Sequence, residues 1–171
     1  MKKEELPIYT DLKDKVIVVT GGGGLICSML SEALAACGAK VALLNLGIES
    51  AQKCVDRIIA DGGIAKAYDC NVLDKNALKK THEEVLRDLG TCDILLNGAG
   101  GNSPKATSDN EYATQNDLSG LYKSFFDLDS DGMQFVFNLN YLGTVLPTQE
   151  FAKDMVERKS GSILNISSMN A

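Results

Sequence analysis

The chain has 171 residues, about the size of one compact domain, and its 44% hydrophobic and 23% charged residues are typical of globular proteins. Its formal net charge of -6 disfavours nucleic acid and anionic membranes as partners, because both are bound by clustered lysine and arginine. No stretch has the roughly 18 unbroken apolar residues of a membrane helix, and the first residues, MKKEELPIYTDLKDK, lack the apolar run of a secretory signal.

Short apolar runs alternate with segments of helical periodicity along the chain. We expect strands at 16–19, 41–44, 64–68, 94–96 and 162–167, and helices at 26–37, 49–60, 75–89 and 133–158. Asp74 is the expected N-cap of the third helix, and Pro147 is expected to kink or break the fourth. The alternation predicts an α/β fold, a doubly wound parallel sheet of the Rossmann type, forming one dinucleotide-binding domain over residues 1–171.

The segment between Gly100 and Gly132 is polar and has no strong periodicity. It follows the fourth predicted strand at the carboxyl edge of the sheet, where ligands bind in such folds. Residues 101–131 are therefore predicted to be a substrate-side loop. Lys105 and Lys123 within it are candidates to meet the carboxylate of an acidic substrate, with ordinary surface charge as the more common alternative.

A glycine cluster joins the first predicted strand to the first predicted helix. Gly21, Gly22, Gly23 and Gly24 precede Leu25 and Ile26, which open that helix. Glycines allow a pyrophosphate to approach the backbone, and the helix start offers free N–H groups. The pattern predicts a dinucleotide phosphate site formed by these six residues, against the alternative of a flexible glycine-rich loop. No Gly-Lys-Ser/Thr follows, which excludes a Walker-type loop.

Five cysteines lie in or beside apolar stretches, without a CxxC pair: Cys27, Cys37, Cys54, Cys70 and Cys92. Their odd number and spacing favour buried free thiols in a reducing cytoplasm over disulfides. No cluster has metal-ligand spacing, so no metal site is expected. The sole histidine, His82, lies in the charged segment KKTHEEVLRD and is expected to be solvated.

Four motifs in chain order resemble those of the short-chain dehydrogenases/reductases. TGGGGLIC resembles the family's TGxxxGxG fingerprint, although Leu25 and Cys27 replace its second and third glycines. In the alternative TGxxGxxG spacing, Gly21 and Gly24 match and Cys27 still does not. The stretch Asn97, Gly98, Ala99 and Gly100 resembles the NNAG motif, Asn140 in NLNYLGT matches the catalytic Asn, and Ser168 in ILNISSMNA matches the active-site Ser. The resemblance extends from about residue 12 to 171.

The resemblance implies hydride transfer between a nicotinamide cofactor and a carbonyl or alcohol of a small molecule. Ser168 would orient the substrate oxygen and Asn140 would hold a water of the proton relay, while residues 97–100 would support the sheet and line the cofactor. It also implies a homo-oligomer, a dimer or a tetramer. The strings TGGGGLICSML, FFDLD, LPTQEFAKDMVE and ISSMNA are similar to the D-mannonate oxidoreductase (fructuronate reductase) branch, which implies a sugar-acid substrate.

Two asparagines bear on the cofactor. Asn45 ends the second predicted strand, where a carboxylate favours NAD and a nearby arginine favours NADP. An amide there, without Lys or Arg directly after it, favours NAD without excluding NADP. Asn71 either meets the adenine amino group, as the family position implies, or is a turn residue.

The family's Tyr-x-x-x-Lys pair is expected shortly beyond Ser168, whereas the sequence ends at Ala171. Tyr9 and Lys13 have the spacing but precede the first strand, so we interpret them as coincidental. We therefore expect this chain to be part of a longer protein. A fragment stabilised by self-association is the alternative. For function, the alternatives to an oxidoreductase are a non-catalytic dinucleotide-binding module, which 171 residues alone would form, and a nucleotide-sugar epimerase. Without a following segment, the fifth strand would be an exposed edge.

Overall fold

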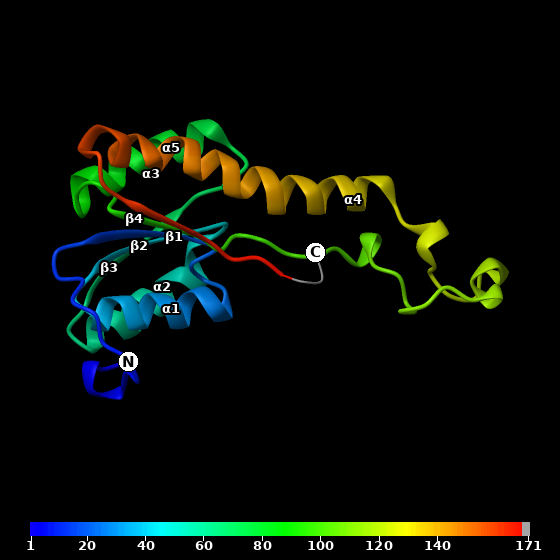
Figure 1. Ribbon diagram of the computed structural model, residues 1–171, viewed down its shortest axis with the longest axis horizontal. Coiled ribbons are helices and arrows are strands. Elements are labelled where there is room, and N and C mark those ends of the chain that lie inside the picture. The colour runs from blue at the N-terminus through cyan, green and yellow to red at the C-terminus, as the bar shows by residue number, and fades with distance from the viewer. Residues whose placement is uncertain (169–171) are drawn as a thin grey trace.

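The computed structural model describes residues 1–168 (Figure 1). Five parallel strands form one sheet: β1 (Val16–Thr20), β2 (Lys40–Asn45), β3 (Ile64–Asp69), β4 (Ile94–Asn97) and β5 (Ser162–Asn165). The helices are α1 (Leu25–Ala36), α2 (Ile48–Ala60), α3 (Lys75–Asp88), α4 (Ser130–Phe137) and α5 (Gly143–Arg158). The strand order is β3-β2-β1-β4-β5. This confirms the predicted doubly wound sheet, whose order reverses between β1 and β4.

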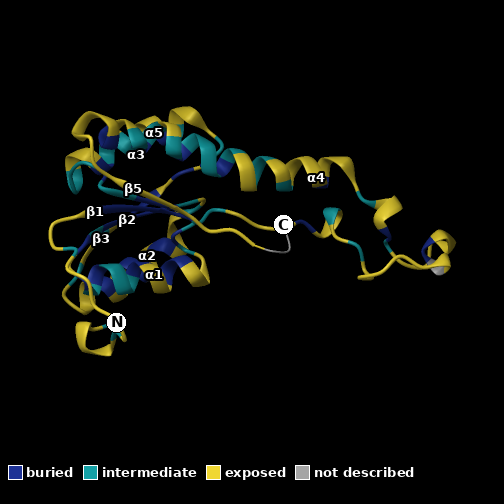
Figure 2. Cartoon of the chain, in the orientation of Figure 1, coloured by how far each residue is buried: buried dark blue, intermediate teal, exposed yellow. Residues whose placement is uncertain are grey.

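Helices cover both faces of the sheet, with α1 and α2 on one side and α3 and α5 on the other (Figure 1). Side chains alternate along a strand, so β1 contributes to both cores. Ile17 and Val19 pack in the cluster with α1 and α2, while Val16 and Val18 pack in the cluster with α3 and α5. The apolar runs of β1, β2 and β4 are therefore buried on both faces, as the dark strands at the centre of Figure 2 show.

The predicted start of α3 is confirmed, because the Asp74 carboxylate accepts hydrogen bonds from the N–H groups of Asn76 at 2.8 Å and Ala77 at 3.3 Å. These bonds satisfy two backbone donors that a helix start leaves unpaired.

The prediction that the helix kinks or breaks at Pro147 is wrong about the position of the irregularity. The proline is buried within α5, and the irregular turn lies one turn earlier, where Asn138–Leu142 form a π-helical turn between α4 and α5. In this turn the Gly143 N–H donates to the Asn138 carbonyl. Proline lacks an N–H and crowds the carbonyl four residues before it, so the helix adjusts on the N-terminal side of the ring.

The expectation that His82 is solvated is also wrong. Its side chain is 12% exposed and lies between α3 and α5. Nδ1 is 3.0 Å from Glu150 Oε1 and Nε2 is 3.0 Å from Asp154 Oδ1, while the ring packs on Phe151 with centroids 4.8 Å apart. His82 therefore fastens two helices that cover the same face of the sheet.

Residues 101–131, hereafter the arm, extend away from the body and return through α4 (green to yellow at the right of Figure 1). The arm contains short 3-10 turns at Pro104–Ala106, Gln115–Ser119 and Phe125–Asp127.

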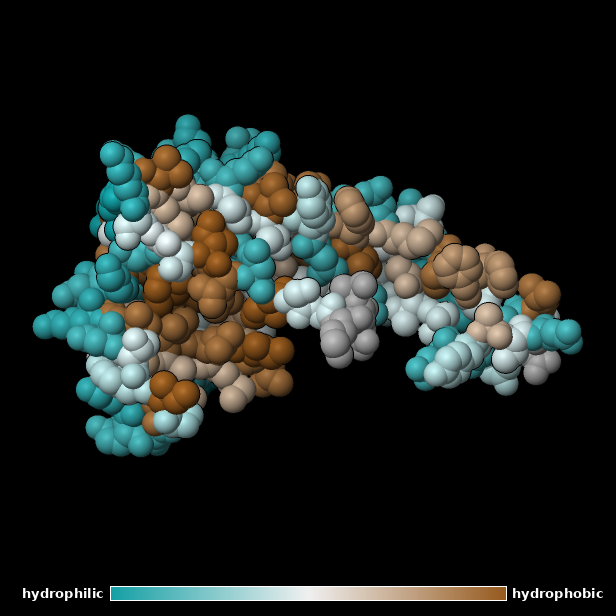
Figure 3. Space-filling model, viewed as in Figure 1, coloured by the Kyte–Doolittle hydropathy of each residue, from teal (hydrophilic) through white to brown (hydrophobic). Residues whose placement is uncertain are grey.

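β5 is the last strand at one edge of the sheet, and all four of its residues are exposed. Hydrophobic side chains gather on the surface of the body (Figure 3). The expected exposed edge is thus present in this chain. None of the helices in the described part of the chain is long and apolar enough to cross a membrane.

Candidate active site and dinucleotide site

The carboxyl ends of β1 and β4 are tied together by the side chain of Thr20. Its Oγ1 accepts hydrogen bonds from the N–H groups of Gly98 and Ala99, each at 3.1 Å, and the residue is fully buried. The two loops that leave the sheet at its switch point are therefore held side by side, and the predicted site lies between them.

The glycine turn bends sharply out of β1. Gly21 has φ +66°, and a Cβ there would come 2.8 Å from the Gly98 carbonyl oxygen, so this position requires glycine. The Gly22 N–H donates to the Leu44 carbonyl at 3.0 Å, which fastens the turn to β2. Gly24 is the N-cap of α1, and no side chain caps this helix start.

The first N–H groups of α1 thus face outward beside a turn without side chains, the arrangement that binds phosphate. Leu25 and Ile26, which open the helix, are 80% and 63% exposed. These two exposed apolar side chains lie at the surface where the sequence predicts that the cofactor binds. The structure therefore brings all six residues predicted from the glycine cluster to one edge of the sheet.

The Asn45 amide is held in one orientation. Its Nδ2 lies 3.1 Å from the Leu46 carbonyl, 2.9 Å from the Gly47 carbonyl and 3.0 Å from Ser50 Oγ, and Oδ1 accepts from the Gly23 N–H at 3.2 Å. An amide nitrogen has only two hydrogens, so these neighbours occupy both. What remains available to a ligand is a lone pair on the oxygen.

Asn71 is exposed, and its Oδ1 accepts a hydrogen bond from the Leu73 N–H at 3.0 Å. This is the turn role that the sequence left open, and a contact with adenine stays a prediction.

Asn97 fastens three elements around the end of β4. The residue is 2% exposed, and its Nδ2 donates to Thr148 Oγ1 of α5 at 3.0 Å and to Asn165 Oδ1 of β5 at 2.9 Å. Its Oδ1 is buried without a hydrogen-bond partner among the described residues. The Asn97 amide thus ties β4 to α5 and β5.

Cys27 and Gly98 fit one another across the sheet edge. A Cβ at Gly98 would collide with Cys27 Sγ, and the Cys27 side chain is buried. Cys27 stands where the family fingerprint has glycine, and Gly98 stands where NNAG has asparagine. The two differences from the family motifs therefore compensate one another, because the Cys27 thiol fills the space that a side chain at position 98 would occupy. Burial raises the pKa of the Cys27 thiol, which keeps it neutral.

Asn140 lies in the π-helical turn, and its side chain both accepts and donates a hydrogen bond with the backbone of the loop after β4. Its Oδ1 accepts from the Gly101 N–H at 3.0 Å, and its Nδ2 donates to the Gly101 carbonyl at 2.8 Å. A Cβ at Gly100 would come 2.7 Å from this Oδ1, so glycine lets the amide approach. The sequence did not predict this reciprocal pair, because 39 residues separate its partners.

Ser168 follows β5 by three residues and is exposed. The Ile166 N–H donates to the Asn97 carbonyl at 2.9 Å, so this segment leaves the sheet at the same edge as residues 97–100. Its catalytic role stays a prediction. Residues 169–171 of the same motif lie outside the described residues.

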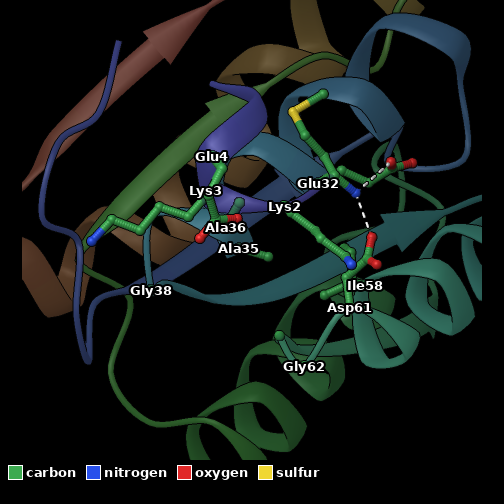
Figure 4. A pocket seen from close by; sticks show the side chains of 12 residues that line it. Lys2, Lys3, Glu4, Glu32, Ala35, Ala36, Gly38, Ile58, Asp61 and Gly62 are labelled. Carbon is green, nitrogen blue, oxygen red and sulfur yellow. Dashed lines mark hydrogen bonds and ion pairs between the residues drawn. The ribbon is translucent and has the colours of Figure 1, made fainter. Parts of the chain in front are cut away.

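A hollow of about 370 Å³ lies at the opposite, amino edge of the sheet (Figure 4). The Met1 ammonium closes one side of it, 2.5 Å from Asp61 and 3.6 Å from Glu32. Parallel sheets of this kind bind ligands at the carboxyl edge, so this hollow is not the dinucleotide site. Among residues 1–168, no three His, Cys, Asp or Glu side chains are grouped to hold a metal ion.

The family model described as short chain dehydrogenase matches residues 15–171, from the start of β1 through the motif after β5. The chain belongs to the short-chain dehydrogenase family.

Among relatives, the chain is 53% identical to an uncharacterised oxidoreductase of Haemophilus influenzae, over 94% of this chain and 56% of the relative. It is 41% identical to the uncharacterised oxidoreductase UxuB of Bacillus subtilis, over 97% and 59%. The chain thus spans less than two thirds of these relatives.

Solved structures of the family are similar to this chain. One, from Haemophilus influenzae with bound NAD and provisionally named a D-mannonate oxidoreductase, has a TM-score of 0.89 and 52% identity, covering 94% of this chain and 57% of that one. NAD+-bound xylitol dehydrogenase has a TM-score of 0.80 and 28% identity, covering 94% and 55%.

Proposed function

We propose that this chain forms the dinucleotide-binding part of an NAD-dependent oxidoreductase that interconverts a carbonyl and an alcohol of a small sugar acid, D-fructuronate and D-mannonate being the specific pair. The observation that carries the proposal is the glycine turn, which meets the uncapped start of α1 beside the loop after β4. The sugar-acid substrate is supported by the provisional name of the related structure with bound NAD.

The residues at this edge fit a dinucleotide. The turn of residues 21–24 has no side chains to obstruct a pyrophosphate, and the N–H groups at Leu25 and Ile26 would bind its oxygens. Residues 97–100 would line the nicotinamide side, and Asn71 would meet adenine. When bound, the cofactor supplies or accepts the hydride.

NAD is the proposed cofactor in preference to NADP because of the fixed amide of Asn45. The amide offers an oxygen, which can accept a hydrogen bond from the ribose 2′-hydroxyl. A 2′-phosphate is an acceptor and finds no free hydrogen on this side chain. The two cofactors differ by one hydrogen bond to this side chain, so a difference of about tenfold in affinity is expected.

Two residues are proposed to take part in the reaction. The Ser168 hydroxyl would orient the reacting oxygen, and Asn140 would hold a water of the proton relay through its backbone. Support comes from the motif matches and from the bonds that join Asn140 to Gly101, which fix the helix beside the loop after β4. The arm, residues 101–131, is proposed as the substrate-side segment.

We also propose that the whole protein is a homo-oligomer, a dimer or a tetramer, of the cytoplasm. The cytoplasmic assignment is supported by the five cysteines, which are all free and buried in the described residues.

The test is a fluorescence titration of the whole protein with NADH and NADPH, followed by an assay of NADH oxidation with D-fructuronate. We expect tighter binding of NADH, turnover of D-fructuronate, and at least a 100-fold loss of kcat in Ser168→Ala with an unchanged Kd for NADH. Binding of NADH without turnover of any keto-acid would favour the non-catalytic module. Failure to bind either cofactor would overturn the proposal.

A further inference from the structure

A pocket of about 510 Å³ lies at the base of the arm. Its polar lining comprises Asn102, Ser103, Thr107, Ser108, Asp109 and Lys123. A volume of this size suits a small ligand, and hydroxyl and amide groups suit a polyhydroxylated one. The groove along α5 and β5 has a larger share of apolar surface than this pocket.

The pocket adjoins the candidate active site. Gly101 exchanges two hydrogen bonds with Asn140, and Asn102 is the next residue, about 3.5 Å further along an extended chain. A small molecule whose reacting carbon lies near Asn140 can therefore place its far end in the pocket.

Lys123 is the cation of this pocket. It is half-buried, and its ammonium donates to the Pro104 carbonyl oxygen across the arm. Among residues 1–168, no carboxylate forms a salt bridge with it. An ammonium has three hydrogens, so two remain for a ligand after the bond to Pro104.

The carboxylates of the arm are instead turned toward its backbone. Asp109 accepts from the Lys123 N–H at 2.8 Å, Asp129 accepts from the Gly132 N–H at 2.7 Å, and Asp127 accepts from Ser124. Hydrogen bonds from the Ser124 side chain and backbone lower the pKa of Asp127. These acids fix the shape of the arm, and within the pocket the Lys123 ammonium is the group available to an anion.

We propose that Lys123 and the polar lining at the base of the arm bind the carboxylate end of the substrate, so that this pocket selects a sugar acid over the corresponding neutral polyol. The inference rests on the proposed function and deepens it. An ammonium recognises a carboxylate through charge-assisted hydrogen bonds, which are stronger than those of a neutral hydroxyl. The Asp109 carboxylate in the same pocket would weaken the attraction, since it carries the same charge as the ligand's carboxylate.

Lys105 provides a matched control. It belongs to the same arm and carries the same charge, but it does not line the pocket, and its backbone packs against Gly132 at the start of α4. Lys105→Gln therefore changes the net charge as Lys123→Gln does, without changing the pocket.

The experiment measures, by calorimetry on the whole protein with NADH present so that no hydride transfer can occur, the Kd of D-mannonate and of D-mannitol, in which a hydroxymethyl group replaces the carboxylate. In Lys123→Gln we expect D-mannonate to bind about 10- to 100-fold more weakly. Binding of D-mannitol and of NAD should not change, Lys123→Arg should retain most of the affinity, and Lys105→Gln should behave as the unmodified protein. Asp109→Asn should tighten D-mannonate binding.

The proposal is overturned if D-mannonate does not bind, if Lys123→Gln weakens both ligands equally, or if Lys105→Gln matches Lys123→Gln. The proposed function is tested separately by NADH oxidation. A Lys123-dependent affinity without turnover would support the pocket and reject the oxidoreductase, whereas turnover with a Lys123-independent affinity would do the reverse. Thermal melting of each variant verifies that it folds.

Discussion

Replacing Thr20 with valine should destabilise the protein through two backbone groups that the hydroxyl now satisfies. Valine has nearly the same shape, so the core packing around β1 is kept. The N–H groups of Gly98 and Ala99, each 3.1 Å from Thr20 Oγ1, would lose their acceptor. An unsatisfied buried donor costs about 1–3 kcal/mol, and both groups are only partly buried, so we expect a loss of about 2–4 kcal/mol.

Thr20→Ser is the control, because serine keeps the hydroxyl and removes one methyl group, at a cost of about 1 kcal/mol. Urea unfolding of both variants at equal slope gives the two free energies of unfolding. NADH affinity should fall in the valine variant as well, since Thr20 holds the glycine turn beside residues 98–99. A valine variant no less stable than the serine variant would refute this account of Thr20.

The remaining predictions concern Asp93 and Cys92. Burial alone would raise the pKa of Asp93, but bonds from Arg158 at 2.7 Å, the Val16 N–H at 2.9 Å and Lys15 at 3.3 Å outweigh it and lower the pKa. The stabilisation should be complete above the unfolded-state pKa of about 3.9 and lost as pH falls through the lower folded value. Asp93→Asn should therefore cost about 1–3 kcal/mol at pH 7 and less at pH 3, and urea midpoints that show an equal cost at both would contradict this. Burial, with the nearby carboxylate of Asp154, raises the pKa of Cys92 to about 12. A thiol reagent should label the cysteines only after unfolding, and rapid labelling of Cys92 in native protein would contradict its burial.

Local pattern was sufficient for most of the fold. The β-branched run Val16–Val19, the glycine cluster and the Asp74 cap each act over a few residues, so their structures follow from neighbouring sequence. The site at the carboxyl edge followed from strand order, since loops after parallel strands meet there.

The error at His82 and the departures at Cys27 and Gly98 involve partners far away in sequence. His82 lies in a segment that looks like a solvated helix face, but Glu150 and Asp154, 68 and 72 residues later, bury it. The fit of Cys27 against Gly98 is of the same kind, because each residue alone resembles a damaged motif. Sequence periodicity carries no information about such pairs, which only packing of distant helices and loops creates.

The π-helical turn at Asn138–Leu142 has a consequence for how the arm is aimed. A π turn contains one residue more than an α turn, and each residue of an α-helix advances the side-chain direction by about 100°. The extra residue therefore rotates the side chains of α4 relative to those of α5, while the face of α5 that packs on the sheet stays the same. Deleting one residue here would rotate α4 and everything attached to it while leaving the core untouched. Under the proposed function, in which the arm contacts the substrate, an insertion or deletion in this turn would change substrate range without any substitution in the pocket.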